Sequence, residues 1–326
     1  VDVLERASIY TLIAPEEVLL RLGAARESAG ETERALRTYR RVYDEFPRSE
    51  QASAAEEAIE ALKSQPGIPA GRVPALLARA ERLFAARQWT EAKAGFAPLL
   101  PLVTGDDREL VALRLAECDN YLNRHTAAQN ALVPWLETAT RQAEVRYVHL
   151  TATRGMGQRT RYVALARGLV TDHPESPWAE QTLNEFASHY ITIDDDAEAD
   201  DVFQELVRRF PGGRYADRAA WKIGWFAYKE GRLGEAASTF EAAAIASPRA
   251  NYRPSWLYWA ARAHDRLGDR PAATALYRVV AGDYLNSYYG RLASDLLAER
   301  GDATVPPIVI RTPAGATPAV QDPAAA

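Results

Sequence analysis

The chain has 326 residues, 47% of them hydrophobic and 25% charged, and its formal net charge is −5 at pH 7. This length exceeds the usual range of a single hydrophobic core, so we expect either two domains or an elongated array built by repetition. The acidic balance argues against nucleic acid as a partner, and no apolar run approaches the roughly 18–20 residues that span a bilayer. Ala, Leu, Arg and Glu dominate the composition, which favours helices.

A helical hairpin is predicted near the N-terminus, because small and apolar residues recur at helical spacing in EEVLLRLGAARESAGETERALRTYRRVYDEFP. The residues that carry this pattern are Leu22, Gly23, Gly30, Ala35, Tyr39 and Pro47. The segment SQPGIPAGRVP follows, and its three prolines and two glycines cannot sustain a helix. We therefore predict N-terminal hairpins over residues 1–64 and a Pro/Gly linker over residues 65–74.

Weaker hairpin patterns follow the predicted linker. They surround two groups of residues, Trp89, Ala92 and Phe96, and then Leu115, Tyr121 and Ala128. Cys118 is the single cysteine, so an internal disulfide is excluded, and its apolar neighbours at helical spacing predict a buried side chain. The segment RGMGQRT around Met156 is predicted to be a turn, since no strand precedes its glycines as a phosphate-cradling loop would require.

A 37-residue repeat is visible in the second half of the chain. The phrases DHPESPWAE, RFPGGRYAD and ASPRANYRP look like helix ends, and their prolines lie 37 residues apart, at Pro174, Pro211 and Pro248. An aromatic residue follows each proline by four positions, at Trp178, Tyr215 and Tyr252. One further step loses the proline but keeps the aromatic residue, Tyr289 in DYLNSYYG. Each period therefore predicts one helical hairpin.

Inside this period the sequence resembles the tetratricopeptide repeat, a helical hairpin in which small residues let two helices pack closely. In DRAAWKIGWFAYKEGRLGEAASTFEAAAIASP, Gly224 takes the small position, Gly231 lies between the helices, and Phe240 belongs to the seam of the second helix. The resemblance implies an all-α fold of tetratricopeptide-like helical hairpins stacked in a right-handed superhelix, an α-solenoid, over residues 75–300. We expect the Pro/Ala-rich residues 301–326 to form a disordered linker or tail.

The last repeats also resemble the superhelical domain of soluble lytic transglycosylases, periplasmic enzymes that cleave peptidoglycan. The residues that carry this resemblance are Trp221, Gly224, Trp225, Tyr258, Trp259, Ala260, Ala261, Tyr288, Tyr289 and Gly290. The resemblance implies a scaffold region whose partner is a lysozyme-like catalytic domain missing downstream, with peptidoglycan as a candidate ligand. It also implies a location in the periplasm or cell envelope, although the N-terminal VDVLERASIY carries no signal-peptide pattern.

The sequence supplies no credible catalytic centre. A lysozyme-like transglycosylase needs a protonated carboxyl group, normally the glutamate of a Glu-Ser pair. Glu27-Ser28 lies in a predicted repeat helix and Glu175-Ser176 in a turn before Pro177, so neither pair is expected to face a cleft. The five histidines lack HExxH spacing, and the acidic run IDDDAEADD lacks the central glycine of a calcium loop. We therefore predict no catalytic, cofactor-binding or metal-binding residues and no enzyme activity for this chain.

One aromatic stripe is the candidate binding site. Trp221, Trp225 and Tyr228 are spaced i, i+4 and i+7, and the next repeat places Tyr258 and Arg262 at corresponding positions. In tetratricopeptide hairpins the first helix lines the concave face, where aromatic rings and a guanidinium group can stack on sugars or hold a carboxylate. The same stripe also fits a seam that seals adjacent hairpins, and the sequence leaves both interpretations open.

The sequence is compatible with two binding functions, whereas a third, an enzyme in its own right, lacks a catalytic centre. The first is a non-catalytic superhelical scaffold of a periplasmic lytic transglycosylase that positions a catalytic domain or the glycan substrate. The alternative is a stand-alone tetratricopeptide scaffold of the cell envelope that binds an envelope protein partner in its groove. Under either function, we expect this chain alone to release no anhydro-muropeptides from purified sacculi.

Overall fold

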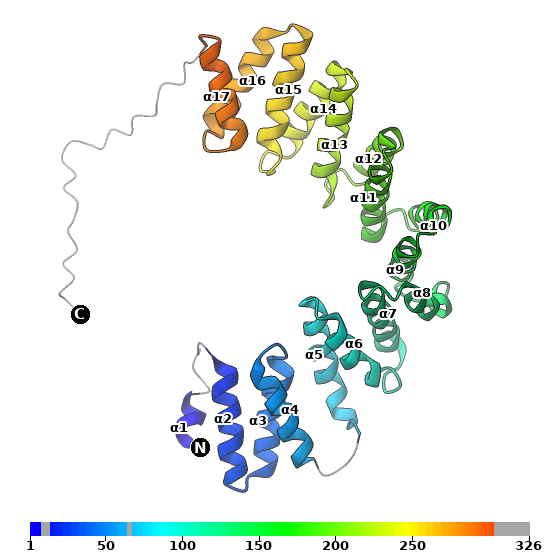
Figure 1. The fold of residues 1–326 in the computed structure, drawn as a ribbon, viewed down its shortest axis with the longest axis vertical. Coiled ribbons are helices and arrows are strands. Elements are labelled where there is room, and N and C mark those ends of the chain that lie inside the picture. Colours follow the sequence, from blue (N-terminus) through cyan, green and yellow to red (C-terminus); the bar gives the residue numbers. More distant parts are fainter. Residues whose placement is uncertain (8–13, 64–66, 303–326) are drawn as a thin grey trace, which may run out of the picture. The chain divides into compact units, whose positions relative to one another are not determined.

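The computed structural model describes residues 1–7, 14–63 and 67–302. Within these residues the regular structure consists of seventeen α-helices and three short 3₁₀ turns, without a strand (Figure 1). The predicted all-α fold of stacked tetratricopeptide-like hairpins is confirmed. No helix in the described part of the chain combines the length and apolar character needed to cross a membrane. The predicted tail lies outside the described residues beyond position 302.

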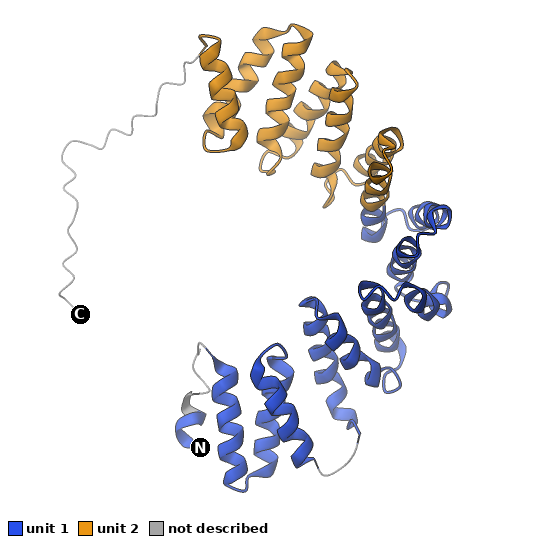
Figure 2. Cartoon of the chain, viewed as in Figure 1, with its two compact units in different colours: residues 1–182 blue, residues 183–326 orange. Residues whose placement is uncertain are grey.

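The helices form two compact units, residues 1–182 and residues 183–326, which we call the N-terminal and C-terminal units (Figure 2). The N-terminal unit contains α1 (Asp2–Ala7), α2 (Pro15–Ser28), α3 (Thr32–Glu45), α4 (Glu50–Leu62), η1 (Ala70–Arg72), α5 (Val73–Ala85), α6 (Trp89–Phe96), η2 (Ala97–Leu99), α7 (Gly105–Tyr121), α8 (His125–Leu132), η3 (Val133–Trp135), α9 (Gln142–Gly155) and α10 (Arg159–Asp172). The boundary falls inside α11 (Pro177–Thr192). The C-terminal unit continues with α12 (Asp196–Arg209), α13 (Ala216–Lys229), α14 (Leu233–Ala246), α15 (Arg253–Leu267), α16 (Arg270–Asp283) and α17 (Tyr288–Glu299).

Prolines and left-handed residues mark the ends of the helices. As predicted, α10, α12 and α14 each end two residues before a proline, at Pro174, Pro211 and Pro248. The turn inside each of the later hairpins holds one residue with positive φ, and these residues are 37 apart, at Gly157, Asp194, Gly231 and Gly268. Arg87 and Asn123 take this conformation in the two hairpins before them, with φ of 61° and 60°. Glycine adopts this conformation at the lowest cost, and Asp194, Arg87 and Asn123 adopt it in the turns that lack glycine.

Small residues let the two helices of a hairpin touch. A Cβ atom added to Gly224 would lie 2.4 Å from Cε1 of Phe240, and one added to Gly23 would lie 2.5 Å from Cε1 of Tyr39. Carbon atoms in contact are normally about 3.5–4.0 Å apart, so only glycine fits at these two positions. Both glycines therefore occupy the small position of the first helix that the repeat pattern predicts.

In a regular array, the first and second helices of successive hairpins alternate along the chain. The N-terminal unit departs from this order after α4. Residues 67–72 hold only the turn η1, and α5 begins at Val73. α5 also packs against α3, where Arg72 donates two hydrogen bonds to Asp44 at 2.7 and 2.8 Å. The predicted linker, residues 65–74, thus lies inside the N-terminal unit, and its last two residues belong to α5.

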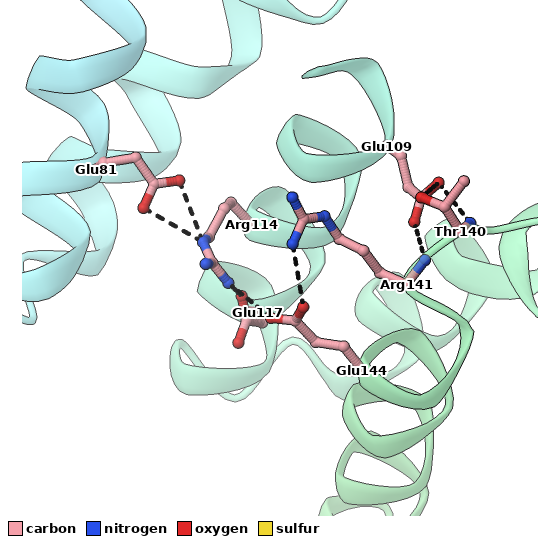
Figure 3. A network of polar contacts seen from close by, with 7 residues as sticks. All are labelled: Glu81, Glu109, Arg114, Glu117, Thr140, Arg141 and Glu144. Atoms are coloured by element: carbon pink, nitrogen blue, oxygen red, sulfur yellow. Dashed lines mark hydrogen bonds and ion pairs between the residues drawn. The ribbon is translucent and has the colours of Figure 1, made fainter. Parts of the chain in front are cut away.

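A partly buried charge network joins α5, α7 and α9 within the N-terminal unit (Figure 3). Arg114 on α7 donates from Nε to Glu81 on α5 at 3.2 Å, and from Nη1 to Glu117 at 2.5 Å and to Glu144 on α9 at 3.3 Å. The guanidinium group of Arg141 lies 3.9 Å from Glu144 at the edge of the network. Three carboxylates therefore share one half-buried guanidinium group, which leaves negative charge in excess.

The charge excess changes the protonation of the network. Burial raises the pKa of Glu117 to about 7, against the lowering effect of Arg114. The carboxylates in turn raise the pKa of Arg114, although burial opposes them, so the guanidinium group keeps its charge. Near neutral pH, Glu117 is thus the group that takes up and releases a proton. Glu109 is not part of this exchange, because it accepts hydrogen bonds from the backbone amides of Thr140 and Arg141, at 2.9 and 2.6 Å.

Candidate binding face in the C-terminal unit

The predicted stripe lies on the first helices of two successive hairpins. α13 carries Trp221, Trp225 and Tyr228, and α15 carries Tyr258 and Arg262. The three rings on α13 form a row, with neighbouring centroids 6.0 Å apart and interplanar angles of 12° and 11°. The structure therefore brings the predicted residues of α13 together, as their helical spacing requires.

Trp259 connects the row on α13 to the next hairpin. Its ring meets Trp225 edge to face at a centroid distance of 4.9 Å and Tyr228 at 5.0 Å. Tyr258, the residue before Trp259, also contacts the Trp259 ring edge to face, at a centroid distance of 5.8 Å. Such pairs add to the stability that ring burial provides. The prediction from helical spacing omitted Trp259, although the phrase WLYWAAR contained the signal in an aromatic residue beside Tyr258.

Burial separates the aromatic residues into two classes. Tyr228 and Tyr258 are only 9% and 4% exposed, whereas Trp221, Trp225 and Trp259 are half-buried. The two tyrosines therefore belong to the core of the stacked hairpins, and the three tryptophans form the accessible part of the stripe. A role in binding stays a prediction for the tryptophans.

Two arginines lie beside these rings. Arg262 donates from Nη1 to the hydroxyl of Tyr258 at 3.4 Å, and its guanidinium carbon lies 6.0 Å from the ring centroid of Trp259. Arg266 donates to the backbone oxygen of Tyr228 at 3.3 Å, and its guanidinium carbon lies 4.9 Å from that residue's ring centroid. Neither arginine forms an ion pair with another described residue. The face therefore combines apolar rings with two guanidinium groups that form no direct ion pair with a described residue.

The Tyr-Tyr-Gly phrase at the start of α17 has a structural explanation. A Cβ atom on Gly290 would lie 1.8 Å from the carbonyl oxygen of Tyr284, so only glycine fits there. Ser287 caps the helix, because its hydroxyl accepts a hydrogen bond from the amide of Gly290 at 2.9 Å. Tyr289 packs on Tyr258 at a centroid distance of 5.3 Å. This segment therefore begins α17, which packs onto the array as the first helix of a further hairpin.

Other residues considered from the sequence have local structural roles. Cys118 is fully buried, as predicted, and burial raises the pKa of its thiol to about 12, which makes it unreactive. Asp195 caps α12 by accepting a hydrogen bond from the amide of Glu198 at 3.3 Å, so the acidic run holds a turn and the start of a helix. The hydroxyl of Ser176 accepts from the amide of Trp178 at 3.2 Å. Across the described ranges, no group of three or more His, Cys, Asp or Glu side chains is arranged to hold a metal ion.

Comparisons with known proteins match a repeat in the N-terminal unit. Residues 17–49, which cover most of α2 and all of α3, match the family model of the tetratricopeptide repeat. No curated protein sequence matches the chain. Similar solved structures include PilF of Pseudomonas aeruginosa (14% identity, 70% of this chain and 98% of that chain, TM-score 0.45), a tetratricopeptide repeat protein from Parabacteroides merdae (13%, 72% and 94%, 0.41) and RapI in its apo form (9%, 89% and 93%, 0.48). None of these matches links the chain to lytic transglycosylases.

Proposed function

We propose that the chain is a non-catalytic scaffold that binds a segment of a partner protein through an aromatic face formed by Trp221, Trp225, Trp259, Arg262 and Arg266. The observation that carries this proposal is the row of half-buried tryptophans beside two arginines without ion-pair partners. Trp and Arg are the side chains that most often dominate binding energy at protein interfaces. The partner segment that suits this face is acidic and carries apolar side chains.

A more specific version of this function rests on the sequence resemblance to soluble lytic transglycosylases. In that version, the region lies in the periplasm and positions a lysozyme-like catalytic domain or a glycan strand. The alternative is a stand-alone tetratricopeptide scaffold of the cell envelope. Both versions give this chain a binding role, so the aromatic face can be tested before the two are separated.

The aromatic face is tested with the purified chain and the variants Trp225→Ala and Arg266→Glu. Retention is measured on purified sacculi and on an isolated lysozyme-like transglycosylase domain, and the melting temperature is measured alongside. Arg249→Glu is the matched control, because Arg249 is exposed and lies in a turn outside the face. We expect both face variants to weaken retention at least about tenfold, as loss of an interface hot spot does. If the wild type is retained and both face variants are retained as well as the control variant, this face is not the binding site.

Two further measurements separate the versions. A domain with Glu-Ser and Gly-Leu-Met-Gln segments, encoded in frame after Ala326, would support the transglycosylase version, and a stop codon there would support the stand-alone scaffold. The chain alone is expected to release no anhydro-muropeptides from sacculi, and detectable release would contradict the non-catalytic role. Fractionation of cells that express the full gene tests the expected periplasmic location.

A further inference from the structure

The N-terminal unit has a pocket of about 310 Å³ where the regular alternation of helices is interrupted. Its walls come from α3, α4, α5, α6 and the segment that leads into η1. In the regular part of the array, a second helix packs between its own first helix and the next one, as α8 does between α7 and α9. The corresponding place after α4 is between α4 and α5, and residues from both helices line the pocket.

The floor of the pocket is apolar and incompletely covered. It is formed by Ile59 of α4, Ile68, Leu76 of α5 and Leu99 of η2. The first three are half-buried, whereas Leu99 is fully buried. The volume corresponds to roughly ten water molecules, which is the space of a few side chains and not of a whole helix. An occupant would therefore insert one face and leave the rest of its surface outside.

Two arginines of the pocket have no anionic partner. Arg40 on α3 and Arg79 on α5 are half-buried, and neither forms an ion pair with a described residue. Arg79 is held in place by Tyr43, because its Nε donates to the backbone oxygen at 3.1 Å and its guanidinium carbon lies 3.8 Å from the ring centroid. The other charged groups of the pocket are already engaged, Arg72 with Asp44, Lys63 with Glu60 and Glu56 with the hydroxyl of Tyr43. The two arginines are thus the groups that a ligand carboxylate would meet.

We infer that this pocket docks one face of an acidic amphipathic helix from a partner protein. Aliphatic side chains of that helix pack on Ile59 and Leu76, and its carboxylates pair with Arg40 and Arg79. α4 is not followed by a second helix of its own hairpin. The partner helix, from another chain, makes the contacts that such a second helix would have made. Helices bind grooves in this way through apolar residues at i, i+3, i+4 and i+7. The inference is independent of the aromatic face, which lies in the C-terminal unit.

The test uses the full chain and a fluorescein-labelled, stapled helical peptide with Leu at i, i+3, i+4 and i+7 and Glu at the flanking positions. A second peptide keeps the Leu stripe and replaces each Glu by Lys. Arg40→Glu removes a pocket charge that makes no hydrogen bond or ion pair within the described residues, and Arg37→Glu makes the same charge change at an exposed position of α3. By fluorescence anisotropy, we expect Arg40→Glu to raise the Kd of the Glu peptide at least about tenfold and Arg37→Glu less than about threefold.

A steric variant tests the pocket without changing its charge. Ala94 is exposed on α6 and lines the pocket, so Ala94→Trp fills the space from outside the core. We expect this variant to keep the wild-type melting temperature and to lose binding of the Glu peptide. Equal affinity for the Glu and Lys peptides, equal effects of Arg40→Glu and Arg37→Glu, or wild-type affinity of Ala94→Trp would each overturn the inference. Self-association of the chain that Arg40→Glu abolishes would also overturn it, by assigning the pocket to a second copy.

Discussion

The close approach at Gly224 can be tested by adding a single methyl group. In Gly224→Ala, the new Cβ atom would lie 2.4, 2.6 and 2.7 Å from Cε1, Cζ and Cδ1 of Phe240. These distances are about 1 Å shorter than a normal carbon contact. Phe240 is fully buried, so its ring cannot swing into solvent. The variant must therefore separate α13 from α14 or force the ring out of its preferred rotamer.

The expected loss follows from two opposing effects. Overpacking of a well-packed core costs about 1–3 kcal/mol, whereas replacing a glycine inside a helix by alanine returns up to about 1 kcal/mol. We therefore expect Gly224→Ala to lower the free energy of unfolding by about 1–2 kcal/mol, which corresponds to a fall in Tm of roughly 2–8 °C. Gly234→Ala is the matched control, because a Cβ atom at Gly234 on α14 would meet no atom within 4 Å. The control should leave the stability unchanged or raise it.

Urea unfolding followed by far-UV circular dichroism measures both effects. A double variant, Gly224→Ala with Phe240→Leu, gives the methyl group room, so its loss should be smaller than the sum of the two single losses. If Gly224→Ala is as stable as Gly234→Ala, α13 and α14 do not approach closely at Gly224, and that position does not require a small residue.

Three further predictions concern Glu117, the two turn residues Arg87 and Gly231, and Asp265. Burial raises the pKa of Glu117 to about 7, so the free energy of unfolding of the wild type should fall as pH rises from about 4.5 to 7. Over this window, the free energy of unfolding of Glu117→Gln should rise relative to that of the wild type by about 1–3 kcal/mol. Parallel curves of stability against pH would contradict this. Arg87→Gly should raise the stability by up to about 1 kcal/mol, since Arg87 has φ of 61°, and Gly231→Ala should lower it by about 1–2 kcal/mol, both measured by thermal unfolding. Burial opposes but does not prevent the lowering of the pKa of Asp265 by hydrogen bonds, including two from Arg300 at 2.7 and 2.9 Å, so Asp265→Asn should lose about 1–3 kcal/mol at neutral pH. The loss should shrink as pH falls below about 4, where aspartate in the unfolded chain takes up a proton while the native carboxylate, with its lowered pKa, stays charged. A constant loss at all pH values would count against it.

The sequence by itself determined the local structure and its period. Proline cannot continue a helix, so Pro174, Pro211 and Pro248 predicted the ends of α10, α12 and α14. Gly224 predicted a close helix contact and Gly231 predicted the break between the two helices; the structure gives Gly231 a positive φ, which glycine adopts most readily. These features depend on residues that are neighbours along the chain or are related by one hairpin, which is why a repeat pattern revealed them.

Only the tertiary structure decided which aromatic residues are accessible and where charges meet. Tyr228 has the same helical spacing as Trp221 and Trp225, yet it is buried, because both Trp259 and the guanidinium group of Arg266, from the next hairpin, lie against its ring. Glu81, Glu117 and Glu144 meet around Arg114 only because three helices pack together, and no spacing in the sequence predicts this cluster. Helical periodicity fixes the direction of a side chain on its own helix, whereas burial and pKa depend on the neighbouring helices that cover it.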